Sequence, residues 1–331
     1  MLKFEQNYPL SQITTLQIGG PASGFVRVST EQELIEAITY ANHHRLPYLV
    51  IGGGSNLLVA DEGVNKLVIK NEIEGITKLV RFLRVKSGTT LQHLVDYSIA
   101  QNLSGLQKIT GIPGTVGGAV YGNAGAYGQT ISDYIREVIC FDPSTGSTPS
   151  ISLGTGPLST SSLGTGKIIS LQTDECEFDY RDSIFKRNGL IILEVVFKLD
   201  VGEAKSLRSQ ADEILKKRLV KYPKGIKCPG SFFKNLVASK LAKEMLSKIP
   251  KEKITYGKIS AGYLLEAVGA QGESLGGIEI ARYHANLFVN KGGGKAADFY
   301  TLAKKYAAKV KEQFGITLEP EVQLINLPPI F

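Results

Sequence analysis

Apolar residues recur along the chain in patterns that predict helices and strands. Between residues 34 and 41 they repeat at three- and four-residue spacing, which is typical of one face of an α-helix. Thr30 and Glu33 form a capping box, so this helix is expected to begin beside them. The apolar runs Gly24–Val28 and Tyr48–Ile51 predict flanking strands. The first part of the chain is therefore expected to run strand, helix, strand.

Similar signals predict the helices and strands of the rest of the chain. Thr90 is expected to cap a second helix, and Gly315 to end the last one at the left-handed position that glycine favours. Composition shifts near residue 200, where lysine becomes frequent and glycine thins out, and we expect a domain boundary there. Further strands are predicted at 80–86, 134–141, 177–185, 190–199 and at the C-terminus around 316–324, and further helices at 203–221, 237–248, 260–268 and 295–314.

Two glycine-rich runs, Gly52–Asn56 and Gly111–Gly128, interrupt this pattern. A backbone so poor in side chains can approach a ligand closely and direct several N–H groups at it. We interpret the pair as holding one large phosphate-bearing cofactor, with two ordinary tight turns as the alternative. The apolar, strand-like Leu57–Val59 follows the first run. That order differs from a dinucleotide fingerprint, in which a helix follows, and no P-loop lysine is present.

Composition narrows the class of protein. The chain has 331 residues, of which 43% are hydrophobic and 21% charged, as in ordinary soluble proteins. The net charge of +7 is spread out rather than gathered in basic blocks, which argues against nucleic-acid binding and is compatible with a small polyanionic ligand. Three cysteines and four histidines show no disulfide or metal-binding spacing. No apolar run is long enough for a membrane span, and we expect a cytoplasmic protein.

Three residues outside the glycine runs could carry chemistry. Arg181, among apolar and turn residues, could clamp a carboxylate or phosphate, or simply pair with a neighbouring aspartate. Ser231 follows a glycine and precedes two phenylalanines, without a nucleophile motif; it could relay a proton or merely form a turn. Glu321 lies on the polar face of the C-terminal strand, where a plain surface carboxylate is the alternative.

Six motifs in a fixed order resemble those of one enzyme family. They are Gly52–Asn56, Gly111–Gly118, Gly125–Gly128, Tyr180–Ser183, Gly230–Asn235 and Leu318–Val322, and the opening Thr14–Ala22 is similar too. Together they resemble the UDP-N-acetylenolpyruvoylglucosamine reductases, the MurB flavoenzymes of peptidoglycan synthesis. The resemblance covers nearly the whole chain outside a Ser-, Thr- and Gly-rich insertion at residues 143–167, which we expect to be a flexible part of a hairpin.

The resemblance implies an α+β fold. An FAD-binding module of the vanillyl-alcohol-oxidase (PCMH) type is expected to have two subdomains, at residues 1–75 and 76–200, the second containing the insertion. An α+β substrate-binding domain is expected at residues 201–331, with Glu321 on its C-terminal strand. The family implies a monomer that acts in cell-wall biogenesis, and so in cell shape and division, with no nucleic-acid partner.

The resemblance also implies a reaction. NADPH reduces non-covalent FAD, the flavin passes a hydride to C3 of UDP-N-acetylglucosamine enolpyruvate, and a proton is added at C2 to give UDP-N-acetylmuramate. Arg181 matches the cation beside the substrate carboxylate, where developing charge needs a partner. Glu321 matches the carboxylate near the same group, and Ser231 matches the proton donor to C2.

Further residues follow from the same resemblance. Those implied to contact FAD are Gly52, Gly53, Gly54, Ser55, Asn56, Leu57, Gly111, Gly114, Thr115, Gly117, Gly118, Asn123, Ala124 and Gly125. Those implied to contact substrate are Tyr127, Lys221, Asn235 and Asn286, with Lys221 beside the diphosphate.

Two points of the resemblance leave alternatives. Some family members carry an extra loop whose tyrosine closes over the diphosphate, but Leu199–Glu203 is too short for it, so the chain resembles the loop-less type. Another flavin oxidoreductase of the same fold stays possible, although the absence of histidine from residues 47–60 argues against covalent flavin. A non-catalytic FAD- or nucleotide-binding protein is the third reading, and the joint presence of Arg181, Ser231 and Glu321 argues against it.

Overall fold

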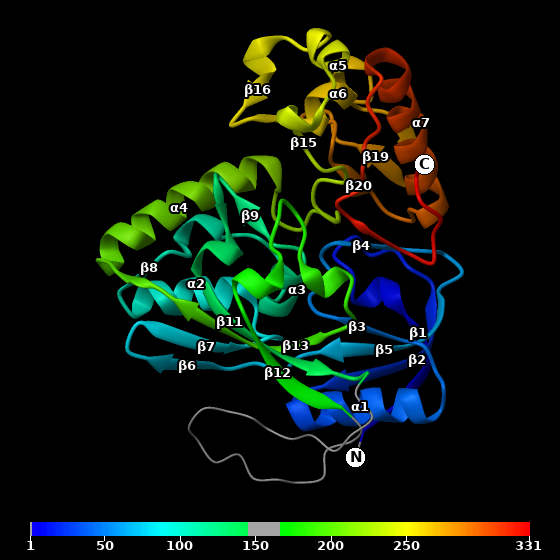
Figure 1. Cartoon of the computed structure of the whole chain (residues 1–331). Coiled ribbons are helices and arrows are strands. Elements are labelled where there is room, and N and C mark those ends of the chain that lie inside the picture. Colours follow the sequence, from blue (N-terminus) through cyan, green and yellow to red (C-terminus); the bar gives the residue numbers. More distant parts are fainter. Residues whose placement is uncertain (1, 145–165) are drawn as a thin grey trace. The chain divides into compact units, whose positions relative to one another are not determined.

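The structure, a computed structural model, describes residues 2–144 and 166–331, so most of the predicted insertion at 143–167 lies outside the described residues. The chain forms two compact units (Figure 1). The first unit comprises Met1–Asn7, Ser23–Gly53 and Asn65–Arg218, and the second comprises Tyr8–Ala22, Gly54–Val64 and Leu219–Phe331.

Helices and strands are both present in each unit, as the predicted α+β class requires. The α-helices are α1 (Glu31–His43), α2 (Leu91–Ala100), α3 (Val116–Tyr121), α4 (Ala204–Lys221), α5 (Lys243–Ser247), α6 (Ala261–Ala267) and α7 (Ala296–Phe314). The strands up to the insertion are β1 (Glu5–Pro9), β2 (Pro21–Val28), β3 (Tyr48–Ile51), β4 (Leu57–Val59), β5 (Val64–Asn71), β6 (Ile76–Leu79), β7 (Phe82–Lys86), β8 (Leu103–Ser104), β9 (Gly125–Ala126), β10 (Gln129–Thr130) and β11 (Ile135–Asp142). Those after it are β12 (Lys167–Gln172), β13 (Ile191–Lys198), β14 (Asp200–Val201), β15 (Leu236–Val237), β16 (Ile254–Thr255), β17 (Lys258–Ile259), β18 (Ser274–Leu275), β19 (Ile278–Ile280), β20 (Phe288–Asn290) and β21 (Gln323–Ile325).

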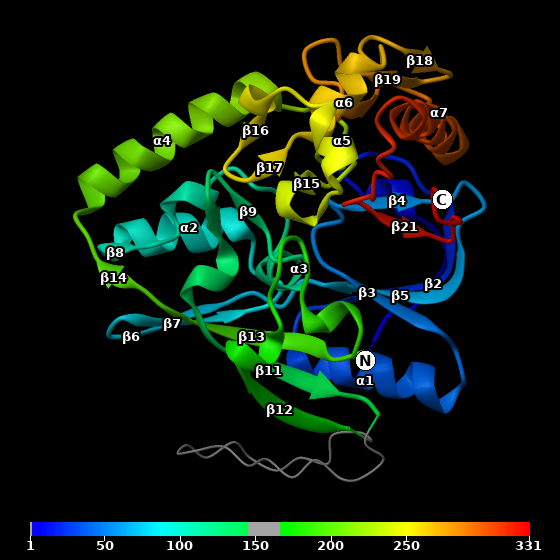
Figure 2. The same ribbon diagram turned by 45° about the horizontal axis from the view of Figure 1, so that its top comes forward.

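A four-stranded sheet in the order β1-β2-β5-β3 opens the fold. Helix α1 lies along one face of this sheet (Figures 1 and 2) and buries Leu34, Ile35 and Ile38 against it. The predicted capping box is confirmed, because the Thr30 side chain accepts from the Glu33 amide while the Glu33 side chain accepts from the Thr30 amide. Strand β3 pairs in parallel with β5 and is an edge strand of the sheet, so the first glycine run directly follows an edge strand.

A five-stranded sheet in the order β12-β11-β13-β7-β6 forms the larger part of the first unit. Helices α2 and α3 lie over one of its faces in Figure 1, and they share a core with β7, β11 and β13. The Thr90 side chain caps α2, as predicted. Strands β11 and β12 are antiparallel, with Asp142 opposite Lys167, so the expected hairpin is confirmed where it enters and leaves the insertion.

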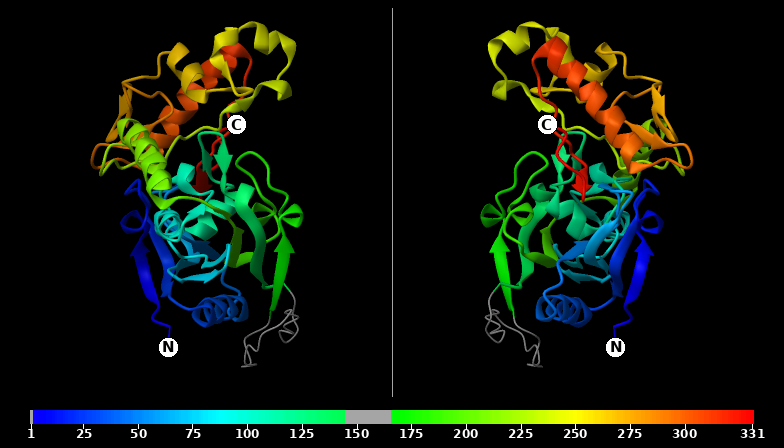
Figure 3. Two further views of the ribbon diagram at one scale, coloured as in Figure 1. Left: turned by 90° about the vertical axis from the view of Figure 1, so that its left-hand side faces the viewer. Right: turned by 90° about the vertical axis from the view of Figure 1, so that its right-hand side faces the viewer.

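The second unit is built around α7. This helix buries Phe299, Tyr306 and Val310 in the core of the unit, and it contacts α6 and β18 (Figure 3, orange-red helix). Gly315 ends α7 with φ +74°, so the predicted C-terminal stop is confirmed. Strands β4 and β21 lie side by side and parallel (Figure 2), which brings Leu57–Val59 into the second unit.

The boundary between the units differs from the predicted position near residue 200. It lies inside α4, between Arg218 and Leu219, and two N-terminal segments belong to the second unit. The physical reason is burial. Leu16, Ile18 and Leu58 pack in the same core as α7, so this part of the N-terminal region folds with the C-terminal third.

The strand predicted over Glu177–Phe185 is wrong. The chain forms instead a two-residue hairpin loop, Tyr180-Arg181, closed by backbone hydrogen bonds in both directions between Asp179 and Asp182. Two short 3-10 helices flank it, η4 (Asp174–Cys176) and η5 (Ile184–Lys186). Arg181 has φ +56°, which a β-strand does not allow.

The C-terminal strand is also shorter than the prediction of 316–324. Only Gln323–Ile325 is a strand, although Leu318 and Val322 are buried as the alternation requires. A single bridge between Phe233 and Pro320 is the remaining sheet contact of this segment. The predicted helix at 237–248 is reduced to α5 and the 3-10 turn η6 (Ala238–Lys240).

Candidate active site

The two glycine-rich runs meet within the first unit. A Cβ atom added to Gly52 would lie 2.2 Å from the Thr115 hydroxyl oxygen, and one added to Gly53 would lie 2.6 Å from the Gly114 Cα. The Gly114 backbone cannot move aside as a flexible side chain can, so only glycine at position 53 permits the two runs to approach so closely. The sequence prediction that the two runs act together therefore agrees with their contact in the structure.

Several backbone amides at this contact face no protein acceptor. Across residues 2–144 and 166–331, the structure records no hydrogen bond from the amides of Gly53, Gly114 and Thr115. Unpaired N–H groups on a bare backbone form the kind of concavity that binds anions. The residues present thus suit the pyrophosphate of a dinucleotide cofactor.

Other glycines that were predicted to contact the cofactor form hydrogen bonds within the protein. The Gly117 amide donates to the Ser87 carbonyl at 2.8 Å, and a Cβ there would lie 2.9 Å from the Ser87 Cβ. The Gly118 amide donates to the Thr115 hydroxyl, which caps α3. The Gly111 amide donates to the Gln92 side chain at 2.7 Å. These three glycines shape the second run, and their amides are already hydrogen-bonded to protein acceptors.

Lys70 was not singled out from the sequence, yet its side chain supports the first run. It lies on β5 opposite Ile51, and its ammonium group donates to the Gly52 carbonyl. Burial lowers the pKa of Lys70, with smaller influences from Glu72 and Arg27. A lysine among the apolar residues of this strand is the signal that the sequence offers for this contact.

The end of the first run belongs to the second unit. Gly54 has φ +64°, and a Cβ there would lie 2.0 Å from the Ile13 carbonyl oxygen. The Asn56 side-chain amide donates to the Glu321 carbonyl at 3.1 Å, and the Asn56 carbonyl accepts from the Gln323 amide at 3.0 Å. Asn56 thereby ties the glycine run to the backbone of a predicted catalytic residue.

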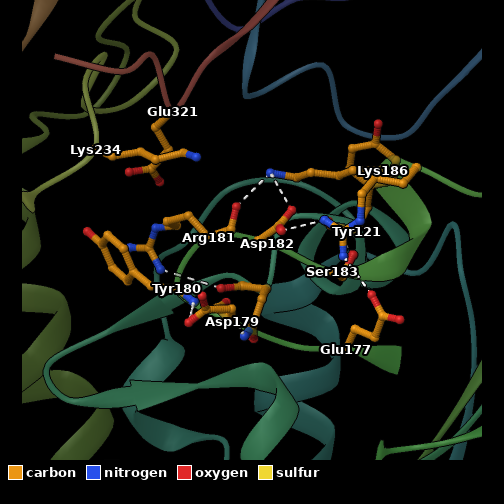
Figure 4. A network of polar contacts seen from close by, with 12 residues as sticks. Tyr121, Glu177, Asp179, Tyr180, Arg181, Asp182, Ser183, Lys186, Lys234 and Glu321 are labelled. Atoms are coloured by element: carbon orange, nitrogen blue, oxygen red, sulfur yellow. Dashed lines mark hydrogen bonds and ion pairs between the residues drawn. The ribbon is translucent and has the colours of Figure 1, made fainter. Parts of the chain in front are cut away.

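Arg181 is held by the end of the second glycine run. Its guanidinium group donates to the carbonyls of Gly125 at 2.7 Å and Asn123 at 3.4 Å. The Lys186 ammonium donates to the Arg181 carbonyl at 2.6 Å, as the dashed line in Figure 4 shows. The Asn123 side chain donates in turn to the Asp179 carbonyl, so the hairpin loop and the glycine run fix each other.

Tyr127, predicted to contact substrate, follows on the same run. It has φ +52° and is 49% exposed, so its ring is available to a ligand. Ala124 is partly buried, and its carbonyl accepts from the Ile131 amide. Ser183, next to the hairpin loop, is fully buried and donates to the Tyr121 carbonyl at 2.8 Å. The turn that carries Arg181 is therefore anchored on α3.

Ser231 lies in the second unit between two polar neighbours. Gly230 before it has φ +89°, and Ser231 itself forms an antiparallel bridge with Leu287. Its hydroxyl oxygen is 3.3 Å from the Lys221 ammonium nitrogen and 3.3 Å from the Tyr222 hydroxyl. The sequence singled out Ser231 and Lys221 for separate roles, and Tyr222 stood out only as part of the stretch Arg218–Pro223 at a helix end, with no role predicted for it.

Glu321 lies on the segment that pairs with the residues after Ser231. The Glu321 amide donates to the Phe232 carbonyl at 2.7 Å, and Phe233 forms a bridge with Pro320. Phe232 and Phe233 are fully buried, which fixes the backbone on both sides. The structure therefore brings the Ser231 and Glu321 segments together in the second unit, whereas Arg181 belongs to the first unit.

Asn286 and Asn235, both predicted to contact substrate, have different surroundings. Asn286 is only 2% exposed, and its side-chain amide donates to the Phe233 carbonyl and accepts from the Phe233 amide, each at 2.8 Å. Its polar atoms are used in holding the Ser231–Phe233 segment. Asn235 is exposed, and its side-chain oxygen accepts from the Ala261 amide at 3.2 Å.

Comparison with known proteins identifies two families, one in each part of the chain. Residues 22–150 match the FAD binding domain family, and residues 222–325 match the UDP-N-acetylenolpyruvoylglucosamine reductase C-terminal domain. The chain is 38% identical over 319 residues to the UDP-N-acetylenolpyruvoylglucosamine reductase of Solibacter usitatus, which covers 96% of this chain and 95% of that protein. This chain belongs to the UDP-N-acetylenolpyruvoylglucosamine reductase family.

Further members of the reductase family match over a similar length. The enzyme of that name from Rubrobacter xylanophilus is 32% identical over 329 residues, covering 98% of this chain and 96% of its own. The crystal structure of UDP-N-acetylenolpyruvylglucosamine reductase (MurB) from Thermus caldophilus superposes with a TM-score of 0.72 at 30% identity, covering 98% of this chain and all of that one. The predicted family, fold class and FAD-binding module are thus confirmed.

None of the helices in the described part of this reductase-family chain is long and apolar enough to cross a membrane. His284 is half-buried, and the charge of Lys221 acts on it. A Cβ on Gly262 would lie 3.0 Å from its ring, and His284 Nε2 is buried without a hydrogen-bond partner among the described residues. Burial, and secondarily the charge of Lys221, lowers the pKa of His284 to about 4.

This shift predicts a pH-dependent stability. An unfolded histidine takes up a proton below pH 6.5, whereas folded His284 stays neutral down to about pH 4, so acid favours the unfolded chain. Within that window His284 lowers the free energy of unfolding by about 1.4 kcal/mol for each unit of pH decrease. We expect urea unfolding of His284→Gln to lose this dependence. Exposed His93→Gln is the matched control, and equal pH slopes in wild type and His284→Gln would contradict the assignment.

Proposed function

We propose that the protein catalyses NADPH-dependent reduction of UDP-N-acetylglucosamine enolpyruvate to UDP-N-acetylmuramate, a step of peptidoglycan precursor synthesis in the cytoplasm. One observation carries this proposal. The chain matches named UDP-N-acetylenolpyruvoylglucosamine reductases from end to end, and it retains Arg181, Ser231 and Glu321 in the motifs that resemble that family. The half-buried Lys221 and Tyr222 beside the Ser231 hydroxyl give a physical reason why a serine could act as an acid there.

FAD is proposed to bind non-covalently to the two glycine-rich runs. The amides of Gly53, Gly114 and Thr115 are the donors available to its pyrophosphate, and Asn123 and Gly125 continue the cradle. When bound, FAD would supply the hydride that adds to C3 of the enolpyruvyl group. The protein contributes the shape of the cradle and the groups that act on the substrate.

Charge control is the first task of the side chains. Addition of a hydride at C3 leaves an electron pair at C2 that delocalises into the adjacent carboxylate. Arg181, oriented by two backbone carbonyls, neutralises this carboxylate as a cation already fixed in place, which costs no reorganisation when the charge develops. Glu321 hydrogen-bonds the same group, and its backbone is held by Phe232 and Asn56.

Proton delivery is the second task. Ser231 donates its hydroxyl hydrogen to C2, which completes the saturated product. Lys221, beside the Ser231 hydroxyl, also carries the positive charge suited to the substrate diphosphate. Tyr127 and Asn235 are proposed to contact the remainder of the substrate, whereas Asn286 acts by holding the backbone of Phe233.

The proposal is tested with purified protein. We expect a yellow protein that releases FAD on denaturation and oxidises NADPH only when UDP-N-acetylglucosamine enolpyruvate is added, with UDP-N-acetylmuramate formed in equal amount by mass spectrometry. Oxygen-dependent turnover of an alcohol would instead show a flavin oxidase of the same fold. Bound FAD without turnover of any of these substrates would show a binding protein, and either result would overturn the proposal.

A further inference from the structure

Tyr222 is placed beside the proton donor of the proposed reaction. It follows directly after α4, and its hydroxyl lies 3.3 Å from the Ser231 hydroxyl oxygen. The Tyr222 ring packs in a small apolar cluster with Cys228, Ala281 and Leu287, which limits its movement. This packing keeps the phenol oxygen near Ser231.

The hydrogen-bond capacities of the three side chains fix the direction of one bond, from Lys221 to Ser231, whereas either hydroxyl of the Tyr222–Ser231 pair can donate. A serine hydroxyl has one hydrogen and two lone pairs, and a lysine ammonium can only donate. Lys221 therefore occupies one lone pair of Ser231. If Tyr222 donates to the other, the Ser231 hydrogen is left for a third partner. If Tyr222 accepted instead, that hydrogen would point at the phenol and could not reach a substrate.

We propose that Tyr222 is a positioning residue for Ser231, and this inference rests on the function proposed above. Tyr222 and Lys221 together donate to the Ser231 oxygen, aim its hydrogen at substrate C2, and stabilise the alkoxide that remains after proton transfer. Two fixed donors around a developing oxyanion are the arrangement that lowers the barrier of many enzymatic reactions. A serine with both donors is a far better acid than a serine in water.

The step balances in protons and electrons. As the electron pair at C2 forms the new C–H bond, the O–H bond of Ser231 breaks and its electrons stay on the oxygen. The Tyr222 hydroxyl then gives its proton to that oxygen, and the phenolate is offset by the Lys221 ammonium, which lies 5.2 Å from the centre of the ring. Water returns a proton to Tyr222, so the net proton comes from solvent.

The test compares Tyr222→Phe with the matched variant Tyr256→Phe, whose phenol is 96% exposed in the same unit. Stopped-flow measurements follow FAD reduction by NADPH and FAD reoxidation by substrate separately. We expect Tyr222→Phe to keep the first rate and to slow the second by about 10²- to 10³-fold, the size of effect of removing one donor from an oxyanion. Tyr256→Phe should keep both.

A second readout separates positioning from packing. With one donor missing, proton transfer from Ser231 becomes more rate-limiting, so the solvent deuterium isotope effect on reoxidation should rise in Tyr222→Phe. A packing defect would instead weaken substrate binding or lower the thermal unfolding midpoint without raising the isotope effect. Replacement of Tyr222 by 3-fluorotyrosine, which keeps the ring and the hydroxyl, should restore the rate.

The outcomes distinguish this inference from the proposed function. If wild-type protein fails to reduce UDP-N-acetylglucosamine enolpyruvate, the function itself is wrong. If wild type turns over and Tyr222→Phe changes reoxidation by no more than about twofold with an unchanged isotope effect, Ser231 acts without Tyr222 and the inference is overturned. Equal loss of both half-reactions would also overturn it, because that pattern shows general damage to the unit.

Discussion

Ser231→Ala is expected to leave reduction of FAD by NADPH intact and to slow its reoxidation by UDP-N-acetylglucosamine enolpyruvate by about a thousandfold or more. Loss of a general acid costs about 10²- to 10⁴-fold in rate. The upper part of that range is expected here, because Ser231 is the proposed donor to C2 and Lys221 cannot replace it without moving. Anaerobic stopped-flow absorbance of the flavin measures both half-reactions in one experiment.

The control for this variant is Ser274→Ala. Ser274 is an exposed serine on β18 of the same unit, so its loss should change neither half-reaction. Ser231→Ala also removes two hydrogen bonds of the folded protein, at a cost of about 1 kcal/mol each. Thermal unfolding therefore belongs beside the kinetics. If both half-reactions fall equally, Ser231 has a structural role and the assignment as acid is wrong.

Local elements were the part of the fold that sequence reasoning predicted best. The capping box of Thr30 and Glu33, the cap at Thr90 and the stop at Gly315 all lie where they were expected. Each depends on a side chain or a backbone angle within one helical turn, so a single stretch of sequence contains the whole cause. The hairpin around the insertion was inferred from the Ser-, Thr- and Gly-rich composition of residues 143–167, although its second strand, β12, was not itself predicted.

Contacts between distant segments could not be predicted in this way. The hydrogen bond from Asn56 to Glu321 joins residues 265 positions apart, and those between Asn286 and Phe233 join residues 53 apart. No local pattern records such pairs. The family resemblance suggested which residues form the active site. It assigned Asn286 to substrate, whereas the Asn286 side chain is hydrogen-bonded to the Phe233 backbone.

The strand predicted over Glu177–Phe185 is wrong because the local pattern did not determine the backbone there. Apolar residues alternate there with polar ones, which favours a strand by period alone. The backbone hydrogen bonds between Asp179 and Asp182 close a tight turn instead, and Arg181 adopts a left-handed angle. The turn has a consequence for the site, because it directs Arg181 to the carbonyls at the end of the second glycine run.

Arg181→Lys tests whether that orientation matters for chemistry. A guanidinium group presents several donors in a rigid planar fork, whereas lysine offers a single point charge. Charge is conserved, so substrate binding should weaken only modestly. Stabilisation of the carboxylate as charge develops should fall more, and we expect reoxidation of FAD by substrate to slow by about 10²-fold, and by about 10³-fold in Arg181→Met.

Arg136→Met is the matched control for these variants, because Arg136 is an exposed arginine on β11 of the same unit. Stopped-flow rates at saturating and limiting substrate separate binding from the chemical step. A role for Arg181 confined to holding the substrate would raise the substrate concentration needed for half-maximal rate and leave the maximal rate unchanged. A loss of maximal rate graded from arginine to lysine to methionine, with reduction by NADPH unaffected, is the result that requires the fixed guanidinium group in the transition state.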